Sequence, residues 1–259
     1  MTDRMTDGSA GDADYGHIAT VYTGFRNPDP RIAAAIESAL GEAVSVLNVG
    51  AGAGAYEPVD RHVTAVEPSE SMRALRPADR PAKDAVAEHL PFADNTFDAA
   101  MATFTVHQWH DLTAGLSEMR RVTRGPIAIL TCDPALVKHF WLNDYTPEVL
   151  EVEARRYPTI DQLAATLGAV EVRPVPIPHD CVDGFNEAYY ARPEILLDPA
   201  ARQACSAWSF VEESAVTRGA TALAQDLADG TWDRHYGHLR TTATFNGSLV
   251  LVIGDAGSR

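Results

Sequence analysis

Short apolar runs alternate with amphipathic segments over most of the chain. The apolar runs predict strands over residues 44–49, 63–66, 97–104, 127–131, 170–177 and 249–253, with a weaker strand over 84–87. Apolar positions three or four residues apart predict helices near 69–75, 111–124 and 159–167. Near-continuously apolar strands that alternate with helices are typical of a doubly wound α/β fold with a mostly parallel sheet.

A helix before the first strand is marked at both ends. Asp29 is a suitable N-cap, and Gly41 directly follows the last apolar residue of the segment. Ile32, Ile36 and Leu40 repeat every four residues, so they predict a buried stripe on this helix. A further helix with an aromatic side is expected over residues 15–25.

Two segments interrupt the alternation. Residues 135–158 are mixed in character and helix-prone, and residues 180–243 are rich in Tyr, Trp and Ala. The second segment is too long for an ordinary connection, so it predicts a helical cap over the carboxyl edge of the sheet, where ligands of such sheets bind. We therefore expect a disordered lead over 1–14, a core formed by 15–178 with 244–259, and a cap insertion over 179–243, before the last strand.

Composition and charge narrow the class of protein. The 259 residues include 21 basic and 36 acidic side chains, which give a net charge of -15 and make nucleic acid an unsuitable partner. The three cysteines are far apart, so neither a disulfide framework nor a metal site is expected. The polar N-terminus has no signal-peptide pattern, and no apolar run is long enough to span a membrane. We expect a cytoplasmic protein, and the sequence leaves its oligomeric state open.

A glycine-rich segment follows the first predicted strand. Gly50, Gly52 and Gly54 alternate with alanines, which lets the backbone turn sharply and approach a ligand closely. A short helix is expected after them, with free N–H groups at its start. Glu67 ends the second strand, where a carboxylate can accept both hydroxyls of a ribose. The pattern predicts a nucleoside-type ligand; it is not the GxGxxG of NAD-binding proteins, and no P-loop is present.

The successive motifs resemble one known family. These are VLNVGAGAGAY, VTAVEPSESM, AEHLPFADNTFDAA, VHQWHD and EMRRVTRGPIAILTC, in this order along the chain. They are similar to the motifs of class I S-adenosylmethionine-dependent methyltransferases, of the small-molecule type related to ubiquinone and menaquinone biosynthesis. The resemblance covers about residues 15–178, and it implies a Rossmann-like seven-stranded sheet whose last strand is antiparallel. It also implies S-adenosylmethionine as cofactor and S-adenosylhomocysteine as product.

The resemblance also implies which residues contact the cofactor. Gly50, Ala51 and Gly52 would line its methionine and ribose side, and Thr103 with Phe104 would lie beside its amino group. Further contacts would come from Glu67 to the ribose hydroxyls, from Pro68 and Met72 to the adenine, and from the backbone around Ala87 and Glu88 to the adenine edge.

Two further matches and two departures concern the ends of the cofactor. Tyr22 and Arg26 match a YxxxR segment that would close over its carboxylate. Asn48 stands where the family usually has an acidic residue at the end of the first strand, which weakens the grip on the amino group. Val86 replaces an aspartate that often lies near the adenine, so backbone groups alone would read that edge.

The methyl acceptor side offers three candidate catalytic residues. A sulfonium methyl needs mainly a correctly placed nucleophile, and a hydroxyl or phenol acceptor also needs a base. His107 and His110 follow the fourth strand, and Asp133 follows the fifth. Each also has a structural interpretation: His107 as a hydrogen-bonded loop residue, and His110 as the neighbour of the helix cap Asp111. We favour a small-molecule acceptor and, slightly, an oxygen atom.

Two alternatives remain open at this point. A protein of this fold can bind S-adenosylmethionine or S-adenosylhomocysteine without methylating anything, and the glycine segment and Glu67 would be the same in both cases. A nicotinamide oxidoreductase is disfavoured by the short connection after Gly54 and by the absence of a YxxxK segment.

Overall fold

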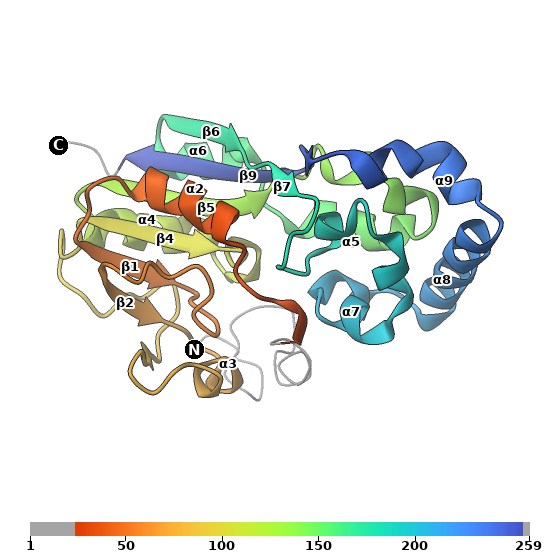
Figure 1. Ribbon diagram of the computed structural model, residues 1–259. Helices are drawn as coiled ribbons and strands as arrows, with labels where there is room; N and C mark the ends of the chain where they lie inside the picture. Colours follow the sequence, from red (N-terminus) through yellow and green to blue (C-terminus); the bar gives the residue numbers. More distant parts are fainter. Residues whose placement is uncertain (1–23, 256–259) are drawn as a thin grey trace.

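The computed structural model describes residues 24–255, which form a seven-stranded mixed sheet with helices on both faces (Figure 1). The strand order is β3-β2-β1-β4-β5-β9-β6, and β9 runs antiparallel to both β5 and β6. The strands are β1 (Ser45–Val49), β2 (His62–Val66), β3 (Ala82–Lys83), β4 (Ala99–Thr103), β5 (Pro126–Cys132), β6 (Val170–Pro174) and β9 (Leu249–Asp255). The predicted doubly wound sheet with an antiparallel last strand is confirmed.

Alternate strand residues enter two separate cores. Val46 and Met101 face the side covered by α2 (Pro30–Leu40), where they pack in one cluster with Ile36. Leu47 and Ala100 face the other side, covered by α4 (Leu112–Val122) and α6 (Ile160–Leu167). Because successive strand side chains point to opposite faces, a strand buried on both faces must be apolar throughout. The short α3 (Glu70–Ala74) follows β2.

A predominantly helical region lies beyond the carboxyl ends of the parallel strands (Figure 1). Its helices are η2 (Val137–His139), η3 (Trp141–Asp144), α5 (Pro147–Arg156), η4 (Asn186–Tyr189), η5 (Pro193–Leu197), α7 (Pro199–Gln203), η6 (Ser206–Phe210), α8 (Glu213–Ala228), α9 (Thr231–Tyr236) and η7 (Gly237–Thr241). The rings of Trp141 and Trp232 lie 5.5 Å apart, and Trp232 is fully buried. Residues 137–156 therefore pack together with 179–243, and we call these two segments the cap.

Three local predictions were wrong. No helix forms between β1 and β2, because Gly50, Gly52, Gly54 and Tyr56 all have positive φ angles, which a right-handed helix excludes. The third strand lies at Ala82–Lys83 rather than over 84–87, because it pairs with the last residues of β2.

The third error concerns the run over 170–177. It divides into β6 and a separate β7 (Ile177–Pro178), which pairs with β8 (Thr244–Phe245) in a small second sheet. Pro174 and Pro176 have no N–H to donate to a continuous ladder, which explains the break.

Two other expectations lie at the chain's start and in its helices. The lead over 1–14 and nearly all of the expected helix over 15–25 lie outside the described residues. Within residues 24–255, no helix is both long enough and apolar enough to cross a bilayer.

Candidate functional site

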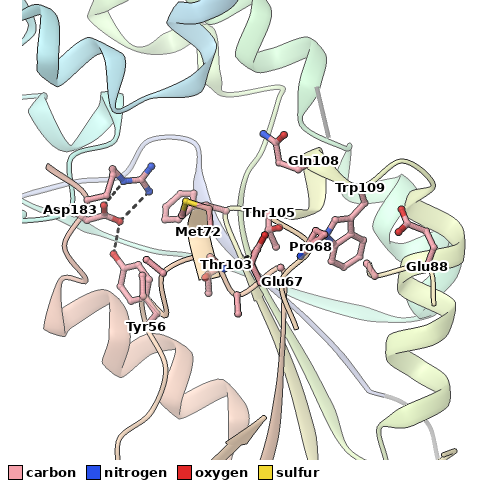
Figure 2. A pocket seen from close by; sticks show the side chains of 18 residues that line it. Tyr56, Glu67, Pro68, Met72, Glu88, Thr103, Thr105, Gln108, Trp109 and Asp183 are labelled. Carbon is pink, nitrogen blue, oxygen red and sulfur yellow. Dashed lines mark hydrogen bonds and ion pairs between the residues drawn. The ribbon is translucent and has the colours of Figure 1, made fainter. Parts of the chain in front are cut away.

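A cavity of about 850 Å³ opens at the carboxyl ends of β1, β2 and β4 (Figure 2). We call it the strand-end cavity; its volume includes space that is open to solvent. All of the predicted cofactor residues that the structure describes line it, namely Arg26, Gly50, Ala51, Gly52, Glu67, Pro68, Met72, Ala87, Glu88, Thr103 and Phe104. Tyr22 lies outside the described residues.

The glycine loop forms one wall of this cavity through its backbone. Gly50 has φ +67°, and a Cβ there would lie 2.1 Å from the Oγ1 of Thr105. Gly52 has φ +50°, and a Cβ there would approach the Cε of Met72 to 3.3 Å. Both positions therefore exclude larger residues, for conformational and steric reasons together.

A buried ion pair supports the glycine loop. It is formed by Arg76 and by Glu57, which lies in the connection where a helix was expected. The Nη2 atom of Arg76 donates to both carboxylate oxygens of Glu57 at 2.8 and 2.9 Å, and these side chains are 2% and 3% exposed. The Nη1 atom of Arg76 also donates to the carbonyl oxygens of Ala51 and Gly52. Asn48 Nδ2 donates to Glu57 Oε1 at 3.0 Å, so Asn48 is part of this support. Sequence reasoning missed both charged residues, because they are distant from each other along the chain.

Glu67 is held rigidly at the end of β2. Its Oε2 accepts a hydrogen bond from the Gly52 N–H at 2.7 Å, and its Oε1 accepts one from the Ser69 N–H at 2.8 Å. Burial raises the pKa of this carboxyl, while the two backbone donors favour its charged form. Each carboxylate oxygen has two lone pairs, so both retain capacity to accept from ligand hydroxyls.

Three residues that were not singled out in the sequence, Thr105, Gln108 and Trp109, also line this cavity (Figure 2). The indole N–H of Trp109 is buried and has no acceptor among the described residues. A buried donor without a partner is costly, so this one favours a ligand acceptor at the same place. Glu88, by contrast, accepts from the Asp111 N–H at 3.0 Å, at the start of α4.

Arg26 connects this cavity with the cap. Its Nε donates to Asp183 Oδ1 at 2.6 Å, and the Tyr56 hydroxyl donates to Asp183 Oδ2 at 2.8 Å (Figure 2). Burial, followed by the nearby Asp183 carboxylate, raises the pKa of Tyr56, so its hydroxyl stays protonated. The Gly184 N–H also donates to the Phe25 carbonyl at 2.8 Å. These bonds fasten the segment before α2 to the cap across the cavity mouth.

A second cavity of about 540 Å³ lies between the strand ends and the cap, and we call it the cap cavity. It shares Arg26 and Phe104 with the strand-end cavity. The other residues that line it are His107, Glu153, Arg156, Tyr157, Phe185, Ala204, Cys205 and Ser206. Phe104 has φ +52°, which is unusual for a bulky residue and typical of functional sites.

The structure brings only one of the three candidate catalytic residues to this region. His107 lines the cap cavity, and its ring lies 4.7 Å from that of Tyr157. His110 is exposed and lines neither cavity. Asp133 also lines neither; its Oδ1 accepts from the Ala135 N–H and orders the turn after β5. His110 and Asp133 were predicted only because they follow strands of the sheet. In the structure neither side chain lines the strand-end cavity or the cap cavity.

Burial and, after it, neighbouring charges shift the pKa values of two groups in the cap cavity. Burial, then the charges of Arg156 and Arg26, holds the pKa of His107 well below its usual value, so its imidazole is neutral. Burial, then the charge of Glu187, raises the pKa of Glu153 to about 7. The described residues contain no group of three or more potential metal ligands, and their three cysteines are free.

Comparisons with known proteins show that the chain is similar to methyltransferases. A family model described as "Methyltransferase domain" matches residues 47–126. The chain is 31% identical over 189 residues to demethylmenaquinone methyltransferase of Mycolicibacterium vanbaalenii, an alignment that covers 73% of each chain. It is 43% identical over 61 residues to the uncharacterized protein YafE of Escherichia coli, which covers 22% of this chain and 30% of YafE.

A solved structure extends the similarity over nearly the whole chain. It is described as "Putative methyltransferase from antibiotic biosynthesis pathway" from Anabaena variabilis, and the two share 30% sequence identity. The superposition has a TM-score of 0.81 and covers 89% of this chain and 98% of the other. The cap is therefore part of the shared architecture.

Proposed function

The chain belongs to the class I S-adenosylmethionine-dependent methyltransferases, and we propose that it methylates an oxygen atom of a small molecule bound in the cap cavity. The observation that carries this proposal is that the two cavities adjoin, with Phe104 and Arg26 lining both. A net charge of -15 supports a small-molecule acceptor over nucleic acid. S-adenosylmethionine is the cofactor of this family.

The residues of the strand-end cavity fit this cofactor. Gly50 and Gly52 expose backbone to the cavity that they line, so a ligand can approach the loop closely. Glu67 would accept the two ribose hydroxyls, and the buried indole N–H of Trp109, which has no acceptor among residues 24–255, supplies a donor in the same cavity. Arg26 would lie beside the carboxylate of the methionyl group, although Asp183 already neutralises part of its charge.

Positioning accounts for most of the catalysis that we propose. The cofactor supplies a methyl group on a positively charged sulfur, which is a good leaving group. Phe104, at the boundary of the two cavities, would orient the acceptor toward that methyl group, and the Arg26–Asp183 contact would restrict water at the mouth. Holding two reactants in line at about 3–3.5 Å supplies several kcal/mol of the barrier reduction.

The first test is calorimetric titration with S-adenosylhomocysteine and, separately, NAD. We expect micromolar binding of S-adenosylhomocysteine and none of NAD. Glu67→Ala should weaken the binding of S-adenosylhomocysteine by about 1–3 kcal/mol, because it removes a charged acceptor from ribose hydroxyls. Glu70→Ala is the matched control, since Glu70 is exposed on α3 and lines neither cavity.

Turnover separates methyl transfer from a purely binding role. Release of S-adenosylhomocysteine that depends on an added acceptor supports the proposal. Tight binding without turnover on any of a broad set of hydroxyl compounds would favour a non-methylating role for the same fold. Binding of NAD in place of S-adenosylhomocysteine would refute the placement of the cofactor.

A further inference from the structure

We propose that Glu153 is the proton acceptor of the cap cavity, and that this cavity takes a neutral, weakly acidic hydroxyl on a flat apolar body. The proposal rests on the proposed function, because it assigns the acceptor to the cavity beside the cofactor. It adds a catalytic residue and a substrate class that the motifs of the sequence do not contain.

The position of Glu153 is fixed on one side only. Asn186 Nδ2 donates to Glu153 Oε1 at 2.9 Å, and Trp208 Nε1 donates to Asn186 Oδ1 at 2.9 Å. The indole therefore fixes the orientation of the amide, and the amide fixes one oxygen of the carboxylate. No described residue donates a hydrogen bond to Oε2, and Glu153 lines the cap cavity. One oxygen is thus available to a ligand.

The neighbouring carboxylate of Glu187 has a different role. Its oxygens accept from the Ser248 N–H at 2.9 and 3.0 Å and from the Ser248 hydroxyl at 3.0 Å. It does not line the cavity, and it holds the turn that leads into β9. Because Glu187 is bonded to Ser248 and does not line the cavity, Glu153 is the carboxylate of this pair that can exchange a proton with a ligand there.

The charged groups around Glu153 discriminate among classes of acceptor. A cationic amine has no lone pair with which to attack a methyl group, and Arg156 and Arg26, the latter partly neutralised by Asp183, line the same cavity. A carboxylate acceptor would meet Glu153 itself, and it would need no base. His107 is a weak base, because its pKa lies well below the usual range. A neutral acceptor that has a proton to lose is compatible with all four groups.

The other groups that face Glu153 are compatible with this role. Burial and the Glu187 charge raise its pKa to about 7, so the carboxylate is a stronger base than an ordinary one and is still ionised in mild alkali. The titratable or charged groups that surround it are Arg26, His107, Cys132, Arg156, Tyr157, Glu187 and Cys205. Burial raises the pKa of Tyr157 and of Cys205, so both stay protonated and uncharged.

Aromatic rings form part of the wall of the cap cavity, beside its charged groups. The rings of Phe104 and Phe185 lie 5.4 Å apart, and those of His107 and Tyr157 lie 4.7 Å apart. These four rings come from three separate parts of the chain and line one cavity. Flat aromatic ligands gain contact area and favourable ring geometry against such walls. The acceptor hydroxyl is therefore expected on an aromatic body.

The chemical step balances with groups already named. The acceptor O–H bond breaks, its proton passes to Glu153 Oε2, and the electron pair stays on oxygen. That oxygen forms the new bond to the methyl carbon as the carbon–sulfur bond breaks, with its electron pair remaining on sulfur. The proton leaves Glu153 to solvent afterwards.

Ligand preference tests the proposal without requiring turnover. The probes are para-cresol, para-toluate and para-methylbenzylamine, titrated into protein saturated with S-adenosylhomocysteine at about pH 8, roughly one unit above the pKa of Glu153. We expect wild type to bind para-cresol at least about tenfold more tightly than para-toluate, because the ionised Glu153 repels a second carboxylate in the same cavity. Glu153→Gln should raise the affinity for para-toluate to at least that for para-cresol, since the substitution removes this repulsion.

Glu151→Gln is the matched control. Glu151 lies on the same helix, pairs with Lys138 in solvent, and should leave the preference unchanged. A wild-type preference for para-toluate or para-methylbenzylamine, no binding of any probe, or an unchanged order in Glu153→Gln would overturn the proposal. Because S-adenosylhomocysteine is bound in every titration, these outcomes leave the proposed function standing, whereas failure to bind it refutes the proposed function first.

A kinetic comparison provides the second readout. General bases contribute about 10²–10⁴-fold to rate, so Glu153→Gln should slow methylation of para-cresol by at least about 10²-fold. Methylation of para-nitrophenol, already ionised in mild alkali, should fall much less. Equal losses for both phenols, or no loss for either, would refute the role of Glu153 as a base.

Discussion

The two cavities of this molecule share two residues and are built in different ways. The strand-end cavity is lined mainly by loops that directly follow parallel strands. The cap cavity collects side chains from segments around residues 26, 104, 153, 185 and 205. The proposed cofactor site therefore depends on short segments at the edge of the sheet, whereas the proposed acceptor site depends on side chains that only the cap brings together.

Their carboxylates differ in the same way. Glu67 is fixed through both oxygens by backbone N–H groups, so it can only accept further hydrogen bonds. Glu153 is fixed through one oxygen by the Asn186 side chain, and its pKa is raised to about 7. The first arrangement suits binding and the second suits proton transfer. The comparison predicts that perturbing the strand-end cavity affects stability and cofactor affinity, while perturbing the cap cavity affects acceptor preference.

The largest expected effect is on the support of the glycine loop. Arg76→Met leaves the buried Glu57 carboxylate without its partner, which typically costs about 3–5 kcal/mol of the free energy of unfolding. Chemical denaturation measures this loss, and affinity for S-adenosylhomocysteine should fall as well. Arg173→Met, which breaks an exposed ion pair at the sheet edge, is the control and should change stability little. Equal stability of the two variants would contradict the supporting role of Arg76.

The next effect concerns the loop itself. Gly50→Ala introduces a Cβ 2.1 Å from Thr105 Oγ1 at φ +67°, so the loop must shift. We expect the dissociation constant of S-adenosylhomocysteine to rise by at least about 10²-fold, which is about 2.7 kcal/mol. Gly237→Ala is the control, because a Cβ there meets its nearest atoms at an ordinary 3.6 Å. Calorimetry measures the affinity, and unchanged affinity in Gly50→Ala would contradict the dependence of cofactor binding on the shape of this loop.

A smaller effect tests the acidity of the cap cavity. Burial and Glu187 raise the pKa of Glu153 from 4.5 to about 7, so between these values the folded chain holds a proton that the unfolded chain has released. The contribution of Glu153 to the free energy of unfolding therefore decreases as pH rises through this window. Glu153→Gln lacks this titration, so relative to wild type it should gain about 1.4 kcal/mol or more between these two pH values.

The control for this pH series is Glu151→Gln, which removes an exposed carboxyl from the same helix. Its stability should follow that of wild type at every pH. Parallel curves for Glu153→Gln and wild type would contradict the raised pKa of Glu153.

The smallest effect is expected at the two candidates that the structure does not bring to the cavities. His110→Ala and Asp133→Asn should change the free energy of unfolding by no more than about 0.5–1 kcal/mol, since neither residue lines the strand-end cavity or the cap cavity. Turnover should stay within about twofold of wild type. A loss of turnover as large as that of Glu153→Gln would show that the acceptor lies elsewhere.

Much of the fold and of the strand-end cavity was predictable from the chain alone. The apolar runs located most of the central strands, and the caps of α2 and α6 lie where Asp29 and Thr159 indicate. The cofactor residues follow from short motifs, because the residue after a parallel strand necessarily lies at the carboxyl edge of the sheet. Local patterns failed after Gly50, where successive positive φ angles replaced the expected helix.

The sequence by itself determined the alternation of strands and helices that forms the sheet. It also determined the glycine loop of the proposed cofactor site. Both depend on residues that are close along the chain. Only the tertiary structure decided that Arg76 and Glu57 support the glycine loop, that His107 faces the cap cavity while His110 does not, and that Glu153 lies there beside Glu187. These relations join segments separated by many residues. The distances between these residues depend on how distant segments pack together. The pattern of apolar residues within a single segment does not specify that packing.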